Sequence, residues 1–394
     1  MAAAHELRAV GADVAVYERS VGRTPARGAG VVVQPEIEAL LNRLAVPAEA
    51  IGVELHERQE LDVRGTATRH EAPQLMTAWD ALYRALREPL ADVCHRLDGS
   101  LRRVQVEGHE VTAEFSDGHT AHGNFLVGAD GIGSATRRLL DPSSRPAYAG
   151  YVAWRGLEPE SRLSGELLDL FAGRLTLFTS SGMQMLCSLV PGPGGELEKG
   201  SRRVNWVWYV NVAEQDLPGL LTGRSGKRFA HFLPPGEALP ETVERVLRQA
   251  EASLPPAFAE LARLSDLFMQ PVLDLPPWRM VADHAALIGD AAGTVRPQSP
   301  AGRPRRSVTP RPWPPPCSGG PRRSRCPPSH WSTGRCGAST TWSRCPGRAG
   351  SRRRRQRWVM GWGTPSSRPP PCRDFADSEI HHDRAFYRAT GPAM

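Results

Sequence analysis

The stretch Ala285-Ala-Leu-Ile-Gly-Asp-Ala-Ala-Gly-Thr-Val-Arg-Pro297 decides the fold class of this sequence. An apolar run ends at Gly289 and Asp290, and small residues follow through Gly293. The pattern predicts a short buried strand and a tight turn, with one carboxylate at the carboxyl edge of a sheet. Ligands bind at that edge in open α/β folds. An ordinary strand and turn with an aspartate helix cap would show the same residues.

A second stretch, Asn124-Phe-Leu-Val-Gly-Ala-Asp-Gly-Ile-Gly-Ser-Ala-Thr-Arg137, repeats this pattern. It predicts a buried strand that ends at the carboxylate of Asp130, then glycines that include Gly131, then the start of a helix. Two such edge carboxylates in one chain are more specific than one. Together, Asp130 and Asp290 favour a ligand-binding α/β sheet over two unrelated caps.

The N-terminal residues predict half of a dinucleotide-binding unit. Residues 2–10 favour a helix that Gly11 ends, and residues 13–19 favour a buried parallel strand that ends at Glu18. In such units the acid at the strand end binds a ribose hydroxyl. The alternative is a solvated pair of Glu18 and Arg19.

The other half of such a unit, a strand and the glycine-rich turn that binds pyrophosphate, would precede Ala2. Without it we expect the strand that ends at Glu18 to be short of one ladder partner, on the side of the absent strand. The cost of that loss would exceed the ~5–15 kcal/mol of a typical domain's stability. We therefore expect this polypeptide to bind a dinucleotide poorly.

Two arginines are candidates for contact with a phosphate. Arg27 begins the turn Arg27-Gly-Ala-Gly30, which leads into an apolar strand or helix start. Arg84 lies near the middle of an amphipathic helix predicted over residues 77–87. Each side chain either reaches a cofactor or is simply solvated.

From residue 150 the pattern changes to long alternating strands, which predict an antiparallel sheet inserted into the α/β domain. The sheet is rich in aromatic residues, including Trp154, Trp206, Trp208 and Tyr209. They suit a pocket for a flat ligand, although packing in a core is the default for aromatic side chains in strands.

Charged residues and cysteines are distributed unevenly along the chain, which separates an arginine-rich segment from the rest. The formal net charge is +7, yet residues 303–373 contain 17 arginines and no Asp, Glu or Lys, so the remainder carries 7 − 17 = −10. Five of the seven cysteines lie in this arginine-rich segment. Their spacing lacks any Cys-x-x-Cys pair, which argues against a zinc site, and we expect no metal site in the chain.

The segment 303–373 contains 14 prolines and no Leu, Ile, Phe or Tyr, and we expect it to be disordered. One explanation is an arginine-rich arm for nucleic acid. The explanation we favour is translation of GC-rich codons in the wrong frame, because ordinary acidic and aromatic residues return at Asp374. Nucleic acid is therefore not an expected partner.

The sequence contains no apolar run of the ~18 residues that a membrane-spanning helix needs. Glu6 and Arg8 stand where the apolar part of a signal peptide would lie. We expect no membrane association and a cytoplasmic location.

In this order, Glu18-Arg19, Arg27-Gly-Ala-Gly30, Gly128-Ala-Asp-Gly131 and Gly289-Asp-Ala-Ala-Gly293 resemble the FAD-dependent aromatic hydroxylases, single-component flavoprotein monooxygenases of the para-hydroxybenzoate hydroxylase fold. The resemblance covers residues 2–302. The runs Gly150-Tyr-Val-Ala-Trp-Arg-Gly and Asn205-Trp-Val-Trp-Tyr are most similar to the dihydroxypyridine hydroxylase branch.

The resemblance implies FAD as cofactor, NADH or NADPH as reductant, and oxygen and a small activated aromatic ring as substrates. The cofactor would be held by Glu18, Arg19, Arg27, Gly30, Arg84, Asp130, Gly131, Gly289, Asp290, Ala292, Pro297 and Gly302, with Pro297 to Gly302 beside the flavin. Tyr209 and Gln298 are candidates for the substrate pocket and for the base, with plain packing as the alternative. After Gly302, the arginines interrupt the small-residue helix that such enzymes continue with.

The expected domains are an FAD-binding part at 1–149, the antiparallel substrate domain at 150–265, a second FAD-binding part at 266–302, the arginine-rich segment at 303–373 and a short remnant at 374–394. A homodimer is possible. The rival functions are a reductase or halogenase of the same fold, a nucleic-acid binder that acts through the tail, and an inactive gene remnant.

Overall fold

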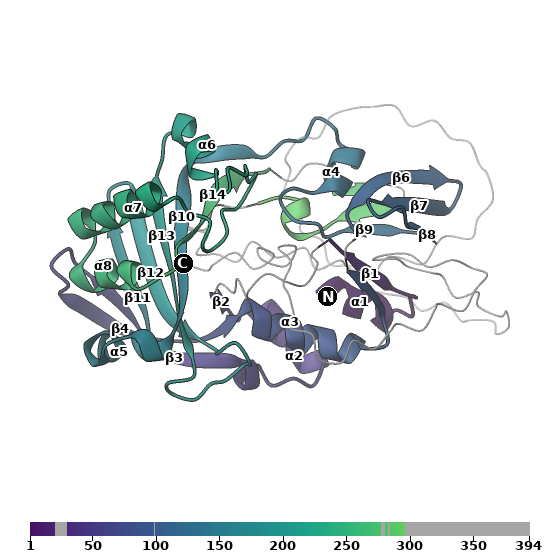
Figure 1. The fold of residues 1–394 in the computed structure, drawn as a ribbon. Coiled ribbons are helices and arrows are strands. Elements are labelled where there is room, and N and C mark those ends of the chain that lie inside the picture. The colour runs from purple at the N-terminus through teal and green to yellow at the C-terminus, as the bar shows by residue number, and fades with distance from the viewer. Residues whose placement is uncertain (20–29, 98, 277–279, 283, 295, 297–394) are drawn as a thin grey trace, which may run out of the picture. The chain divides into compact units, whose positions relative to one another are not determined.

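The computed structural model describes residues 1–19, 30–97, 99–276, 280–282, 284–294 and 296. The contact pattern divides the chain into two units, and every described residue belongs to the first. The arginine-rich segment 303–373 and the remnant 374–394 lie outside the described residues. The predicted α/β class is confirmed, and the elements appear in Figure 1.

The N-terminal residues form the predicted helix and strand. Helix α1 spans Ala2–Ala9, and strand β1 spans Ala15–Glu18. Strand β5 (Cys94–Leu97) pairs with β1 in parallel, with Ala15 opposite Cys94. Among the described residues, no strand pairs with the other edge of β1.

The two stretches that decided the fold class lie on adjacent parallel strands. Strand β9 (Leu126–Gly128) pairs with β16 (Ala285–Leu287), and the short strand β15 (Val281–Ala282) is antiparallel to β16. The expected helix start after β16 is a single 3-10 turn, η5, over Gly289–Ala291.

A small antiparallel meander follows β5. Its strands are β6 (Leu101–Glu107), β7 (Glu110–Phe115) and β8 (Thr120–Gly123). Val111, Ala113 and Phe115 alternate along β7 and bury one face together with Leu126 and Ala285. The meander therefore packs against the pair of strands that carries the two edge motifs.

The predicted antiparallel sheet is confirmed and has eight strands in the order β14-β10-β13-β12-β11-β3-β4-β2. All neighbours are antiparallel except β11 and β3, which are parallel. The strands are β2 (Gly30–Val32), β3 (Gly52–Leu61), β4 (Ala67–Ala78), β10 (Ala147–Pro159), β11 (Arg174–Ser180), β12 (Met183–Val190), β13 (Arg203–Asn211) and β14 (Phe268–Asp274). The sheet thus includes three strands that precede residue 150.

One face of this sheet is covered by helices α7 (Pro240–Ser253) and α8 (Pro256–Arg263), as Figure 1 shows. Proline begins each helix, where its missing N–H costs no hydrogen bond. On α7, Thr242, Val246 and Ala250 recur every four residues and are buried. The core on this face includes Trp154, Trp206 and Trp208, so the alternative of core packing is the right one for these three tryptophans.

The remaining helices are short. They are α2 (Pro35–Arg43), α3 (Trp79–Arg87), α4 (Ala135–Leu140), α5 (Gly165–Phe171) and α6 (Leu217–Leu220), with 3-10 turns η1 (Ala48–Ile51), η2 (Glu88–Leu90), η3 (Glu160–Arg162) and η4 (Glu214–Asp216). Residues on α2 and α3 share a second buried cluster with Val14 and Val16 near β1. This cluster positions α3, which carries Arg84, beside the N-terminal elements.

Candidate functional site

The two edge motifs meet at one edge of the sheet. Leu287 lies opposite Gly128 in the parallel ladder, and the Ile288 N–H donates to the Gly128 carbonyl at 2.9 Å. Both strands therefore end side by side, and the residues that follow them, Asp130 and Asp290, are brought to the same edge. The topology agrees with the position at which open α/β sheets bind ligands.

Arg137 ties the two motifs together. Its guanidinium is almost fully buried and donates to the carbonyls of Asp290 at 3.4 Å and Ala291 at 3.1 Å. It also donates to the carbonyl of Ile132 in the turn after β9. Burial lowers the pKa of Arg137, and the nearby carboxylates of Asp130 and Asp290 oppose that shift. Arginine stays protonated in proteins, so this edge keeps a fixed positive charge.

The Asp130 carboxylate organises the turn between β9 and α4. It accepts hydrogen bonds from the N–H groups of Ala135 at 2.7 Å and Thr136 at 3.0 Å, and from the Ser134 hydroxyl. Gly131 has a φ of 70°, a left-handed conformation that favours glycine. These bonds fix the turn. They also give the carboxylate oxygens of Asp130 hydrogen-bond donors from the protein itself.

The Asp290 motif is compact. Asp290 lies in η5 and is 5% exposed, and Ala291 and Ala292 beside it are also buried. Gly289 has a φ of 57°, so a side chain at this position would be strained. The turn after β16 therefore needs glycine, as the sequence pattern implied.

The residues at the end of β1 differ in exposure. Glu18 is half-buried, and Arg19 is exposed. Tyr17, just before them, stacks on Phe115 of the meander with ring centroids 4.5 Å apart. Glu18 is therefore not fully solvated, and its role at a ribose hydroxyl stays a prediction.

Arg84 on α3 is half-buried rather than simply solvated. Its Nη2 atom is buried and has no hydrogen-bond partner among the residues that the structure describes. A Cβ added to Gly195, in the turn between β12 and β13, would lie 3.4 Å from this nitrogen. A buried cationic donor needs an anionic or polar partner, so this atom fits a ligand oxygen.

A buried ion pair joins α3 to the large sheet. The Arg203 guanidinium on β13 donates to the Asp80 carboxylate at 2.8 Å, and these side chains are 5% and 3% exposed. Arg203 also donates to the carbonyl of Pro191 at 2.8 Å. The same region holds Gly30 on β2, where an added Cβ would lie 2.8 Å from the Asn205 amide nitrogen.

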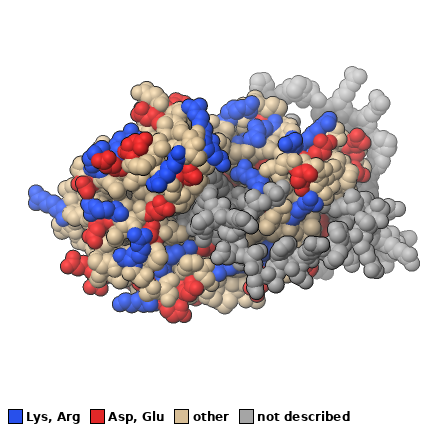
Figure 2. All heavy atoms as spheres, viewed as in Figure 1, with Lys and Arg blue, Asp and Glu red and all other residues tan. Residues whose placement is uncertain are grey.

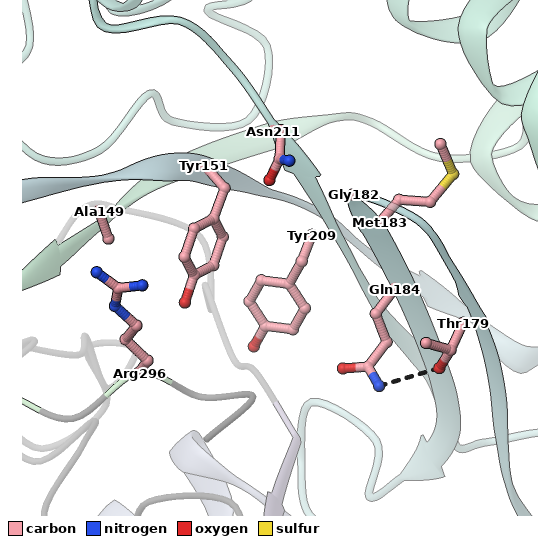
Figure 3. Close-up of a pocket in the computed structure, with 9 residues that line it drawn as sticks. All are labelled: Ala149, Tyr151, Thr179, Gly182, Met183, Gln184, Tyr209, Asn211 and Arg296. Atoms are coloured by element: carbon pink, nitrogen blue, oxygen red, sulfur yellow. Dashed lines mark hydrogen bonds between the residues drawn. The ribbon is translucent and has the colours of Figure 1, made fainter. Parts of the chain in front are cut away.

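A pocket of about 540 Å³ lies on the face of the large sheet opposite the tryptophan core. Its lining includes Tyr151, Tyr209, Gln184 and Asn211 from the strands, and Arg296 beyond the Asp290 motif (Figure 3). The two tyrosine rings meet edge to face, with centroids 6.2 Å apart. Tyr209 therefore lines a pocket, whereas its strand neighbour Trp208 packs in the core.

Arg296 is held at the rim of this pocket by Asp274 at the end of β14. Its Nε donates to the carboxylate oxygens of Asp274 at 2.9 and 3.1 Å. The hydrogen bond from Arg296 holds the pKa of Asp274 below its usual value, despite some opposing desolvation. Arg296 therefore lines the pocket as one member of an ion pair.

Comparison with known proteins places this geometry in a family. A family model described as FAD binding domain-like matches residues 148–274. The chain is 31% identical over 305 residues to 2,6-dihydroxypyridine 3-monooxygenase of Paenarthrobacter nicotinovorans, covering 77% of this chain and 76% of that protein. The chain belongs to the FAD-dependent aromatic hydroxylases.

Two further comparisons agree with this family assignment. The solved structure of 2,6-dihydroxypyridine-3-hydroxylase from Arthrobacter nicotinovorans matches with a TM-score of 0.70, 31% identity and 75% coverage of each chain. The 6-hydroxynicotinate 3-monooxygenase of Pseudomonas fluorescens is 26% identical over 211 residues, half of this chain and 54% of that protein. As a family member, the protein is an FAD-dependent monooxygenase of aromatic or heteroaromatic compounds with a nicotinamide donor.

The described residues of this hydroxylase fit a bound FAD in two places. Arg84 offers a buried donor that lacks a protein partner in the described chain. The turns at Gly131 and Gly289 follow β9 and β16, and their glycines add no side chain at the shared edge of these strands. Four other predicted residues, Arg27, Pro297, Gln298 and Gly302, lie outside the described residues, and their roles stay predictions.

Sequence reasoning missed several residues of the site. Gln184, Tyr151 and Asn211 line the pocket, and Arg137 joins the motifs. Alternation along the strands was the available signal for the first three, because residues opposite one another in paired strands share a face. Arg137 stood inside a quoted motif, and nothing in its spacing distinguished it from a solvated arginine.

Three further observations bear on the expectations about partners. In the part of the chain that the structure describes, no cluster of His, Cys, Asp and Glu could hold a metal ion. None of the described helices is both long and apolar enough to cross a membrane. Figure 2 shows acidic and basic side chains interspersed over the visible described surface of the hydroxylase.

Proposed function

We propose that this hydroxylase acts on a small nitrogen heterocycle that carries hydroxyl groups, of the dihydroxypyridine type. The pocket formed by Tyr151, Tyr209, Gln184 and Asn211 carries the proposal, because it combines flat rings with polar groups in a volume large enough for an aromatic ligand. The similarity to a 2,6-dihydroxypyridine 3-monooxygenase over three quarters of both chains supports it.

In this proposal, residues from α3 and from the ends of β1, β9 and β16 bind FAD. Arg84 holds a phosphate or carbonyl oxygen of FAD with its buried Nη2. Glu18 binds a ribose hydroxyl at the end of β1, and Asp290 binds hydroxyls at the end of β16. Asp130 and Gly131 shape the turn between these positions through the hydrogen bonds to α4. FAD, when bound and reduced by NADH or NADPH, supplies the activation of oxygen.

The protein's part in the reaction is to hold the substrate ring and to exclude water. Tyr151 and Tyr209 provide flat apolar surfaces with hydroxyl groups for a hydroxylated ring. Tyr209 is the described candidate for the group that takes the substrate hydroxyl proton, and Gln298 is the candidate beyond the described residues. A cytoplasmic location and a homodimer stay predictions.

The test uses the full chain with NADH or NADPH, 2,6-dihydroxypyridine and a large excess of FAD, because the sequence predicts weak binding of the dinucleotide. We expect the substrate to accelerate oxidation of the nicotinamide and to yield a product with one added oxygen atom, labelled when ¹⁸O₂ is supplied. Tyr209→Phe should lower turnover by about tenfold or more. Tyr148→Phe is the matched control, since Tyr148 donates to the Val212 carbonyl and is absent from the pocket lining.

Consumption of the nicotinamide with no oxygen in the product would point to the reductase alternative. Failure of the substrate to bind would remove the proposal. Equal effects of the two tyrosine variants would show that the pocket is not the site of the reaction.

A further inference from the structure

The Gln184 side chain is hydrogen-bonded at the wall of the pocket. Gln184 on β12 lies opposite Thr179 on β11 and Tyr209 on β13 in the ladder. Its Nε2 donates to the Thr179 hydroxyl at 3.2 Å. Figure 3 shows this bond and the amide oxygen of Gln184 on the side of Tyr209. The amide therefore presents an acceptor toward the pocket.

That acceptor lacks a donor. Gln184 Oε1 is buried and has no hydrogen-bond partner among the residues that the structure describes. Buried polar atoms in native proteins are nearly always paired, because an unpaired one loses its hydrogen bonds to water without replacement. An unpaired acceptor at the wall of a ligand pocket is complementary to a hydrogen-bond donor on the ligand.

The kind of donor follows from the geometry of the amide. A hydroxyl group rotates and both donates and accepts, so it can use several partners in this pocket, such as Asn211 or a tyrosine. A ring N–H only donates, and it lies in the plane of the ring. A fixed, in-plane donor is matched by an acceptor that is itself held in place, and the hydrogen bond to Thr179 holds the Gln184 amide at the wall of the pocket.

We propose that Gln184 determines specificity by accepting a hydrogen bond from a ring N–H of the substrate. It thereby selects nitrogen heterocycles in their N–H tautomer over phenols with the same hydroxyl pattern. The proposal rests on the proposed function and deepens it, because it names the atom that separates two classes of hydroxylated ring. A site that offers a buried hydrogen-bond partner discriminates strongly against a ligand that lacks the matching group.

The test measures equilibrium binding of two ligands to the full chain by isothermal titration calorimetry. 2,6-Dihydroxypyridine supplies the ring N–H in its lactam form, and 1,3-dihydroxybenzene has a C–H at that place. The unaltered chain should bind the pyridine about tenfold or more tightly than the benzene. Gln184→Leu should weaken binding of the pyridine by about tenfold and leave binding of the benzene nearly unchanged.

Two further variants complete the test. Gln184→Glu keeps an acceptor and should keep the preference for the pyridine. Thr179→Val releases the amide without changing Gln184, and it should reduce the preference by a smaller factor. Because Thr179 is exposed, this variant also tests the proposal should Gln184→Leu fail to fold.

The outcomes that overturn the proposal are specific. Equal losses for the two ligands, or no loss for either, in a folded Gln184→Leu chain would show that the amide does not accept from a ring N–H. Binding and hydroxylation of the pyridine with an unaltered preference in that variant would overturn this inference alone. Failure of the unaltered chain to bind the pyridine would overturn the proposed function, and the inference with it.

Discussion

The guanidinium of Arg137 donates a hydrogen bond of 3.1 Å to the main-chain carbonyl of Ala291, and so connects the two turns that form the predicted FAD site. Further bonds reach the carbonyls of Asp290 and Ile132. A single buried side chain thus satisfies acceptors from segments about 150 residues apart in the sequence. The relative position of the two turns depends on it.

Arg137→Leu should lower the free energy of unfolding by about 2–4 kcal/mol, because buried carbonyls at 290 and 291 lose their charged donor. Urea unfolding followed by circular dichroism measures this change. Arg138→Leu is the matched control, since its exposed side chain bonds the Gly133 carbonyl and no other described residue, and it should stay within about 0.5 kcal/mol of the unaltered chain. Equal effects of the two variants would contradict the assigned connection.

Removal of one partner of the Asp80 and Arg203 pair should be more costly. Asp80→Leu leaves the Arg203 charge buried without its carboxylate, and we expect a loss of about 3–5 kcal/mol. The double variant Asp80→Leu with Arg203→Leu should recover part of the lost free energy of unfolding, because the unpaired Arg203 charge is no longer buried. In the exposed pair of Glu244 and Arg248, Glu244→Leu should cost at most about 0.5 kcal/mol. A double variant less stable than either single variant would refute the argument.

The strands that carry the edge motifs were predictable because short apolar runs ended at Gly and Asp, a local pattern. The membership of β3 in the large sheet could not be predicted from the sequence. Residues 52–61 contain five charged or histidine side chains among ten, so no apolar run marks the strand. The strand is fixed by pairing with β4 and by a parallel contact with β11 more than 100 residues later. Such pairing is a property of the whole sheet and leaves little trace in the local sequence.

The residues of the candidate site were likewise predictable only where a local sequence pattern marked them. Glu18, Asp130 and Asp290 were predicted because each carboxylate lies at or just after the end of an apolar strand pattern. Gln184 was missed because its role depends on register, which sets Thr179 and Tyr209 on either side of it. The aromatic residues were found as a group, and only the register separated Tyr209 in the pocket from Trp208 in the core.

Arg84 gives a prediction about the cofactor. Arg84→Gln removes the buried positive charge, and the affinity for FAD should fall by about tenfold or more if the guanidinium meets a cofactor oxygen. Quenching of FAD fluorescence on titration with the chain measures this affinity. Arg87→Gln, on the same helix, is the control and should retain affinity, since Arg87 bonds the Leu90 carbonyl instead. An Arg84→Gln chain that binds FAD as well as the unaltered chain would remove Arg84 from the site.

His95 on β5 predicts a pH dependence of stability. Burial, with a smaller contribution from the charge of Arg87, lowers the pKa of His95 from 6.5 to about 4. The unfolded chain therefore binds a proton at this residue between pH 6.5 and 4, whereas the folded chain does not. Stability that is present above pH 6.5 is lost as the pH falls toward 4, by about 2 kcal/mol between pH 7 and pH 5.

Urea unfolding at pH 7 and pH 5 tests this sign and size. The pKa values of His5 and His119 are also lowered, chiefly by burial, so they add to the loss in the same direction. His95→Gln should reduce the difference between the two pH values by about 2 kcal/mol, because no titrating group remains at that position. His70→Gln, at an exposed position on β4, is the matched control for the substitution itself. A His95→Gln chain with the full pH dependence would show that His95 is protonated in the folded protein at pH 5.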